Sequence, residues 1–489
     1  MAGKVDITTI STLVKKAQYA VRGPIVAKSQ ELAEVLRSGK STLPFDKIIS
    51  CNIGNPHSLE QKPLSYSRDV LSLVINPSLK DRFAFPSDIV AKAERYLSTI
   101  PGVGAYTDSQ GIITVREDVA KFLEQRDGYK SDPKDIFLTN GASEGVRICM
   151  QTFLRDPQSG FKDGILAPIP QYPLYSALTT LLQGTLEPYY LDESKGWACN
   201  KVQLQESLAQ AKANGTTIRG LVVINPGNPT GQVLDEANMR EIVSFCAEEG
   251  ICLMADEVYQ ENIWKEGSKF ISFRKVALDM GYSAAPSATN KGLQMISFHS
   301  ISKGFYGECG LRGGYFEIFN IPADVKAELY KLSSISLCSN TIGQIATGLM
   351  VQPPQPGEAS YATYRAERDG ILASLRRRSL LLSESLNALE GVSCNAIDGA
   401  LYAFPTITLP GMLLHDLKAS LRSFVLTVSP FLPLFFYSQG RRCREGEWRR
   451  GRCLLLHGAV EQHRHRAGAR VGLRTGPRYL PLPVHDPAP

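Results

Sequence analysis

The chain has 489 residues, of which 43% are hydrophobic and 21% are charged, and this ordinary usage argues against a collagenous, wholly disordered or coiled-coil protein. At roughly 100–200 residues per domain, the length predicts two domains and a large buried core. Residues 411–489 hold 13 Lys and Arg against 5 Asp and Glu, whereas residues 1–410 are slightly acidic, so the main part of the chain lacks the charge of a nucleic-acid binder.

The sequence also indicates a compartment. No apolar run reaches the ~18 residues that a membrane helix needs, and the first ten residues, MAGKVDITTI, lack the apolar core of a secretory signal. The 10 cysteines form no Cys-x-x-Cys pair, which predicts free thiols in a reducing compartment. We expect a cytoplasmic protein with no membrane, nucleic-acid or metal partner; mitochondrial and peroxisomal locations stay open.

Residues 1–410 predict alternating helices and strands. A helix is expected over Ser87–Ile100 with Ser87 as N-cap, a second where Val115 and Val119 begin a helical repeat, and a third over Asp235–Glu249. Short apolar runs predict strands at Asp135–Asn140, Gly164–Pro170, Gly220–Pro226, Ile251–Tyr259 and Gln294–Lys303. This alternation predicts an α/β fold with a largely parallel sheet between helices, in which ligands bind at the carboxyl ends of the strands.

Polar residues follow three of these apolar runs. Lys303 ends one run, where a desolvated amine suits a Schiff base, although a solvated surface lysine is the alternative. Asp256 ends another and would need a cationic partner if buried, for example a protonated pyridine nitrogen; the alternative is an exposed aspartate. Tyr259 could donate to a ring oxygen or simply pack, and Asn228 lies in the turn NPGNPTG, where its amide could bind a ligand oxygen.

Three further segments have the composition of a ligand site. Thr139–Gly145 (TNGASEG) leads from a strand into a helix, where backbone N–H groups can face a phosphate. Pro170–Tyr175 (PQYPLY) offers two tyrosines, one of which could stack on a planar ring. Arg312 could pair with a phosphate or lie on the surface. A lysine, an aspartate, an aromatic face and a phosphate cradle together predict a site for pyridoxal 5'-phosphate.

The same segments carry a family resemblance. The chain resembles the class I/II, fold-type I aminotransferases, and among them the eukaryotic alanine aminotransferases. The resembling stretches are VRGPIV (Val21–Val26), CNIGNPHSL (Cys51–Leu59), IPGVGAYTDSQG (Ile100–Gly111), PIPQYPLYSA (Pro168–Ala177), VVINPGNPTGQ (Val222–Gln232), ADEVYQEN (Ala255–Asn262) and SISKGFYGECGLRGGY (Ser300–Tyr315). The resemblance implies transfer of the amino group of L-alanine to 2-oxoglutarate, giving pyruvate and L-glutamate. Glutamate–glyoxylate transamination uses the same apparatus and stays open.

The resemblance implies roles for residues around the coenzyme ring. Lys303 would form the Schiff base and shuttle the proton, and Asp256 would pair with the ring nitrogen. Tyr259 and Asn228 would hold the phenolic oxygen, and Tyr172 would stack on the ring.

It also implies a phosphate site, a substrate site and a dimer. The phosphate would be bound by the backbone of Ala142 and Ser143 and by the side chains of Ser300 and Arg312. Tyr106 would reach the phosphate in the neighbouring subunit of a homodimer. Gly54 would approach the substrate carboxylate, with Asn228 beside it.

The implied domain order is an N-terminal arm and part of a small α+β domain over residues 1–80, a large coenzyme-binding domain over 81–345, and the start of the C-terminal part of the small domain over 346–410. After Pro410 the resemblance stops, and the family's PGSGFG segment and its carboxylate-binding arginine are not found in residues 411–489. Codons for this tail permit a family-like sequence in the next frame, which suggests a retained intron followed by a frameshift and a disordered tail. We therefore expect an incomplete small domain and impaired transamination; a catalytically inactive coenzyme-binding product is the alternative.

Overall fold

The computed structural model describes residues 5–19, 21, 23–39, 41–48, 53–284 and 292–408. The predictions made for residues 411–489, including the disordered tail and the retained intron, lie outside the described residues. Residues 28–48 form one compact unit and the other described residues form another. None of the described residues in 28–48 is buried.

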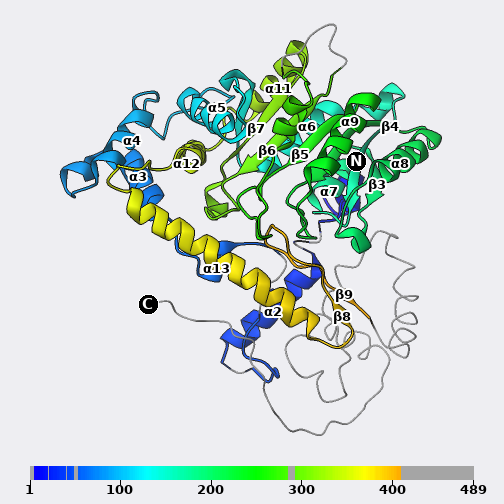
Figure 1. Cartoon of the computed structure of the whole chain (residues 1–489), viewed down its shortest axis with the longest axis horizontal. Coiled ribbons are helices and arrows are strands. Elements are labelled where there is room, and N and C mark those ends of the chain that lie inside the picture. Colours follow the sequence, from blue (N-terminus) through cyan, green and yellow to red (C-terminus); the bar gives the residue numbers. More distant parts are fainter. Residues whose placement is uncertain are drawn as a thin grey trace. The chain divides into compact units, whose positions relative to one another are not determined.

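Thirteen α-helices occur in the described residues. They are α1 (Thr12–Lys16), α2 (Pro24–Arg37), α3 (Ser65–Ile75), α4 (Ser87–Leu97), α5 (Ile113–Asp127), α6 (Ala142–Phe153), α7 (Leu174–Leu181), α8 (Lys201–Ala213), α9 (Glu236–Glu249), α10 (Phe273–Asp279), α11 (Ala323–Ile335), α12 (Thr341–Val351) and α13 (Tyr361–Asn387). Figure 1 shows α13 as one long uninterrupted helix.

Seven strands form the main sheet, in the order β1-β7-β6-β5-β4-β2-β3. They are β1 (Ile136–Thr139), β2 (Asp163–Ile169), β3 (Thr185–Tyr190), β4 (Thr217–Ile224), β5 (Cys252–Asp256), β6 (Met295–Ser300) and β7 (Gly314–Phe319). Strands β3, β2, β4, β5 and β6 are parallel, while β7 runs antiparallel to both β6 and β1. A second, two-stranded ladder pairs β8 (Val392–Ser393) with β9 (Thr406–Ile407).

Helices cover both faces of the main sheet, as predicted. Alternate side chains of the strands point to opposite faces, so Leu253 and Met254 of β5 belong to different core clusters. One cluster adds apolar residues of α8, α9 and α10, and the other adds those of α6, α7 and α11. The central strands are buried on both sides, which explains why they are continuous apolar runs in the sequence.

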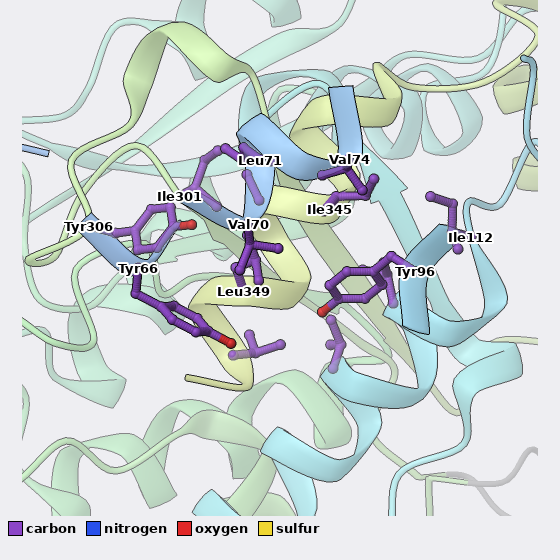
Figure 2. Packing of buried hydrophobic residues seen from close by; sticks show 14 of the residues in the cluster. Tyr66, Val70, Leu71, Val74, Tyr96, Ile112, Ile301, Tyr306, Ile345 and Leu349 are labelled. Carbon is purple, nitrogen blue, oxygen red and sulfur yellow. The ribbon is translucent and has the colours of Figure 1, made fainter. Parts of the chain in front are cut away.

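A third core cluster lies at the β1–β7 end of the sheet and includes Ile136 and Leu138 of β1 and Tyr315 of β7. It joins α3, α4, α5 and α12, with Val70, Tyr96 and Leu349 all at most 1% exposed (Figure 2). Ile301 and Tyr306 also belong to it, although they follow β6 in the chain. Residues on both sides of Lys303 therefore belong to this cluster, and their burial holds the loop that carries the lysine.

Two predictions about elements need correction. Helix α4 begins at Ser87, but its N-cap is Pro86 and no side chain caps it; it ends at Leu97 and not at Ile100. Ser87 is thus one position inside the helix, because Pro86, with ψ 142°, is the last extended residue. Strands β3 and β7 were not predicted at all.

All seven strands of the main sheet fall between residues 136 and 319, inside the range predicted for the large domain. The boundaries near residues 80 and 345 stay a prediction. Within the described residues, no helix has both the length and the apolar character needed to cross a membrane.

Candidate active site

The predicted site residues lie where the parallel strands end. Strand β5 ends at Asp256 and β6 ends at Ser300, three residues before Lys303. Strand β4 ends at Ile224, just before the turn that holds Asn228. Because these strands are parallel neighbours, the residues that follow them meet at one edge of the sheet.

The carboxylate of Asp256 is buried, with 6% of the residue exposed. Its Oδ2 accepts a hydrogen bond of 2.7 Å from the hydroxyl of Tyr175, and its Oδ1 lies 3.4 Å from the backbone N of Val258. Burial raises the pKa of Asp256, while these two hydrogen bonds and the charge of Lys303 oppose the rise. The alternative of an exposed strand-end aspartate is therefore wrong, and the carboxylate lies where a cation would stabilise it.

Lys303 is half-buried, and its amine points toward the segment around Gly54. Its Nζ donates a hydrogen bond of 2.7 Å to the carbonyl of Gly54. The next residue, Gly304, has φ +70°, and its N–H donates to Oδ1 of Asn262 at 2.9 Å. The left-handed backbone at Gly304 turns the chain sharply after the lysine. Hydrogen bonds thus hold Lys303 and the loop that carries it, so it is not a freely solvated surface lysine.

Two polar groups lie near the hydroxyl of Tyr259. Asn228 Nδ2 lies 3.4 Å from this oxygen, and the hydroxyl of Tyr402 lies 2.9 Å from it. Tyr259 is 2% exposed, and burial raises its pKa well above the ordinary value. The phenol is therefore neutral and can donate a proton to an acceptor.

Tyr172 is half-buried at the start of the segment that leads into α7. Its hydroxyl lies 2.6 Å from the hydroxyl of Tyr19, and the two rings meet edge to face at 6.3 Å. Burial raises the pKa of Tyr172 as well. Tyr172 thus forms an aromatic pair with Tyr19, and its stacking on a planar ring stays a prediction.

A cationic group lies at the N-terminus of α6. This helix begins at Ala142, followed by Ser143, and its N-cap is Gly141 with φ +81°. Arg312 is exposed, and its Nη2 donates to the carbonyl of Asn140 at 2.8 Å. A Cβ at Gly141 would lie 2.6 Å from the same Nη2, so glycine is required for the guanidinium to lie there.

Ser300 joins this end of the site. It pairs with Gly314 across β6 and β7, and a Cβ at Gly314 would lie 3.1 Å from both Ser300 Cβ and Gly141 Cα. The end of β6 is therefore close to the start of α6. N–H groups at a helix N-terminus next to an arginine form an anion-binding arrangement.

Tyr106 differs from the other predicted site residues. Its side chain is 77% exposed, so it is not part of the buried cluster that contains Asp256, Tyr175 and Tyr259. This exposure agrees with a residue that acts outside its own subunit, although a partner subunit stays a prediction.

Three site residues were not identified from the sequence: Tyr19, Tyr175 and Tyr402. Tyr175 was quoted in PQYPLY, and its spacing of three from Tyr172 near a helix start could have assigned it a partner beside the ring. Tyr402 follows Gly399 and Ala400, of which Ala400 has φ +56°, and no local motif marks it.

Comparisons with known proteins agree on a family. Residues 68–414 match the model described as aminotransferase class I and II. Alanine aminotransferase 1, mitochondrial, of Arabidopsis thaliana is 51% identical over 412 residues, which cover 83% of this chain and 74% of that protein. Glutamate–glyoxylate aminotransferase 1 of the same plant is 50% identical over 418 residues, which cover 84% of this chain and 83% of that protein.

A crystal structure of an aminotransferase from Escherichia coli has a similar fold, with a TM-score of 0.64 at 24% identity over 86% of this chain and 87% of that one. This likeness bears on the fold alone. It confirms the predicted fold type, an α/β fold around a mostly parallel sheet.

Proposed function

Because the chain belongs to the class I and class II aminotransferases, we propose that it transfers the amino group of L-alanine to 2-oxoglutarate, giving pyruvate and L-glutamate. The relative that is 51% identical and named for alanine supports this substrate. The observation that carries the proposal is the amine of Lys303 at the same edge of the sheet as the buried carboxylate of Asp256.

The family depends on pyridoxal phosphate, and the described residues fit it. The buried acid Asp256 lies at one end, and Arg312 with the start of α6 lies at the other. A protonated ring nitrogen would satisfy the acid, and a phosphate would satisfy the cationic end. When bound, the coenzyme supplies an electron sink that stabilises negative charge on the α-carbon of the amino acid.

Each site residue has a proposed task. Asp256 would keep the ring nitrogen protonated, and Tyr259 with Asn228 would donate to the ring oxygen. Tyr172 would lie against the ring face. The phosphate would be held by Ala142, Ser143, Ser300 and Arg312.

Lys303 would anchor the coenzyme and then act as a base. Its Nζ would take the proton from the α-carbon of the amino acid and would pass it to the coenzyme. In the structure this amine contacts the carbonyl of Gly54, so the lysine already faces the segment proposed to meet the substrate carboxylate. Asn228 would lie beside that carboxylate.

A homodimer is proposed from the surface around Tyr106. Tyr106, Ile335 and Leu337 are 77%, 75% and 51% exposed. The two segments are joined, since Ser109 Oγ donates to the carbonyl of Leu337 at 2.6 Å. An exposed apolar patch of this kind favours a subunit contact. Sedimentation of the wild-type chain tests the homodimer, and we expect a dimer. A coenzyme titration of Tyr106→Ala tests the role of this residue, and we expect weaker binding than in wild type.

Borohydride reduction of the coenzyme-loaded full chain, followed by peptide mapping, tests the site. We expect the reduced adduct on Lys303, its loss in Lys303→Ala, and its retention in Lys326→Ala, whose amine pairs with Asp135 at 2.6 Å. An adduct on any other lysine would overturn the assignment.

A donor panel then tests the substrate. L-Alanine with 2-oxoglutarate is compared with L-glutamate and glyoxylate, because a relative named for the second pair is 50% identical. Faster pyruvate formation supports the proposal, whereas faster glycine formation supports the second reaction. A chain that binds coenzyme but converts neither pair would be the inactive product. The predicted impairment depends on residues 411–489, outside the described residues, and neither the fold nor the relatives support it.

The cytoplasm remains the proposed location. Several relatives are named as mitochondrial proteins and others are not, so the relatives do not decide between the two compartments.

A further inference from the structure

The segment that carries Tyr402 is fixed to two loops of the site. The N–H of Gly399 donates to the carbonyl of Gly231 at 2.8 Å, and the N–H of Ala400 donates to the carbonyl of Asn262 at 3.0 Å. On the other side, the indole Nε1 of Trp264 donates to the carbonyl of Ala400 at 2.8 Å. These bonds link the segment to the loop after β4, which carries Asn228, and to the loop after β5.

The backbones of Gly231 and Tyr402 also lie very close to each other. Gly231 has φ +74°, and a Cβ there would lie 2.9 Å from the carbonyl oxygen of Tyr402. Only glycine lets the two backbones come together at this distance. The position of Tyr402 is therefore set by backbone contacts on both sides, which is how a side chain is preorganised for a task.

The side chain of Tyr402 meets Tyr259 in two ways. The rings pack edge to face, with centroids 5.7 Å apart and planes at 82°, and the hydroxyl oxygens lie 2.9 Å apart. The hydroxyl of Tyr402 also lies 3.3 Å from where a Cβ of Gly54 would be, as does Nζ of Lys303. Tyr402 thus borders the same small space as the proposed base.

Counting protons at the Tyr259 hydroxyl gives Tyr402 a role. A phenol has one proton to donate and can accept from two donors. The amide of Asn228 is one donor. If Tyr402 is the second, the proton of Tyr259 has no protein acceptor among these groups and is left for a ligand oxygen. If Tyr259 instead donated to Tyr402, that proton would not reach the ligand.

We propose that Tyr402 is a positioning residue that donates to Tyr259 and thereby directs the proton of Tyr259 to the ring oxygen of the coenzyme. The inference rests on the proposed coenzyme site and adds a residue to it. A donor that itself accepts a hydrogen bond is a stronger donor, so Tyr402 would also stabilise the anionic form of the ring oxygen.

Tyr402→Phe tests the inference, because phenylalanine keeps the edge-to-face ring contact and removes only the hydroxyl. In the full chain loaded with pyridoxal phosphate, the visible absorption of the bound coenzyme is titrated with pH. Tyr402→Phe loses a hydrogen bond that supports the anionic ring oxygen. The coenzyme should therefore lose the proton next to that oxygen at a pH about half a unit higher. We also expect the coenzyme dissociation constant to rise about fivefold.

A double-mutant cycle separates this role from a general loss of packing. Because Tyr402 is proposed to act through Tyr259, Tyr402→Phe should shift the titration in the wild-type background and leave it unchanged in Tyr259→Phe. The matched control is Tyr129→Phe, which removes a hydroxyl bonded to Asp279 at 2.8 Å outside the site and should titrate like wild type. Equal shifts in both backgrounds would overturn the inference.

The failure of the inference differs from that of the proposed function. If wild type binds coenzyme and Tyr402→Phe titrates like it, only the role of Tyr402 is wrong. If wild type binds no coenzyme, the proposed function is wrong and this inference falls with it.

Discussion

The hydroxyl of Tyr175 donates a 2.7 Å hydrogen bond to the carboxylate of Asp256, and both groups are buried at the end of β5. Burial alone raises the pKa of this aspartate, and the tyrosine is the largest opposing influence. The hydrogen bond from Tyr175 therefore stabilises the ionised form of a carboxylate that burial destabilises. We propose that Asp256 and Tyr175 act together at the coenzyme site.

Asp256→Asn should separate coenzyme chemistry from folding. The amide keeps the shape and can still accept from Tyr175, but it has no charge for the ring nitrogen. Breaking one partner of a buried charge pair costs about 3–5 kcal/mol, so we expect kcat/KM to fall by at least about a hundredfold. Steady-state kinetics measure this. The control Asp279→Asn changes a carboxylate bonded to Tyr129 and Lys275 and should stay near wild type.

Tyr175→Phe should weaken coenzyme binding without removing the charge. A hydrogen bond to an ionised group is worth about 1.5–3 kcal/mol, so the dissociation constant of the coenzyme should rise by roughly ten- to a hundredfold. Equilibrium titration followed by absorbance gives the constant. Tyr189→Phe is the matched control, since it removes an equally buried hydroxyl bonded to the neutral carbonyl of Val222. Equal effects of the two changes would contradict the role of Tyr175.

Much of the main sheet could be predicted because its central strands are buried on both faces. Asp256 and Lys303 could be placed because each follows such a run, and chain order alone puts strand ends at one edge. Strand β3 was missed because Glu187 and Pro188 interrupt its apolar character. Strand β7 contains Glu317, which Arg274 neutralises at 3.1 Å, a contact that no local pattern reveals.

The rest of the site depends on contacts between distant segments. Tyr402 is 143 residues from Tyr259, and Gly54 is 249 residues from Lys303. No spacing rule links residues so far apart. Gly54 was proposed only through family resemblance. The position of Tyr402 beside Tyr259 could be recognised only in the structure.

Gly54→Ala should reduce turnover while the fold and coenzyme binding are kept. The added Cβ would lie 3.3 Å from Lys303 Nζ and 3.3 Å from the hydroxyl of Tyr402, which is tighter than an ordinary contact. Because a small displacement of a reacting amine is costly, we expect kcat/KM for the amino acid to fall about tenfold. Gly310→Ala is the control, since a Cβ there meets nothing within 4 Å. Unchanged kinetics for Gly54→Ala would mean that this space is not used.

Glu257 gives the fold a pH-dependent component. It follows Asp256, its side chain is 1% exposed, and its Oε1 accepts from the N–H of Phe273 at 2.8 Å. Burial raises its pKa from 4.5 to about 7, opposed chiefly by Arg126. Between these two values the folded state holds a proton that the unfolded state releases. The free energy of unfolding therefore falls as pH rises through this window.

Glu257→Gln should remove that loss of stability, because glutamine keeps the acceptor for Phe273 and cannot ionise. Relative to wild type, the variant should gain up to about 3 kcal/mol in unfolding free energy between pH 5 and pH 8. Urea unfolding of both chains at several pH values measures the difference. Glu249→Gln, which breaks a surface ion pair with Lys212, should show no such trend because exposed pairs contribute little. A constant difference between wild type and Glu257→Gln across this range would show that the buried glutamate is ionised throughout.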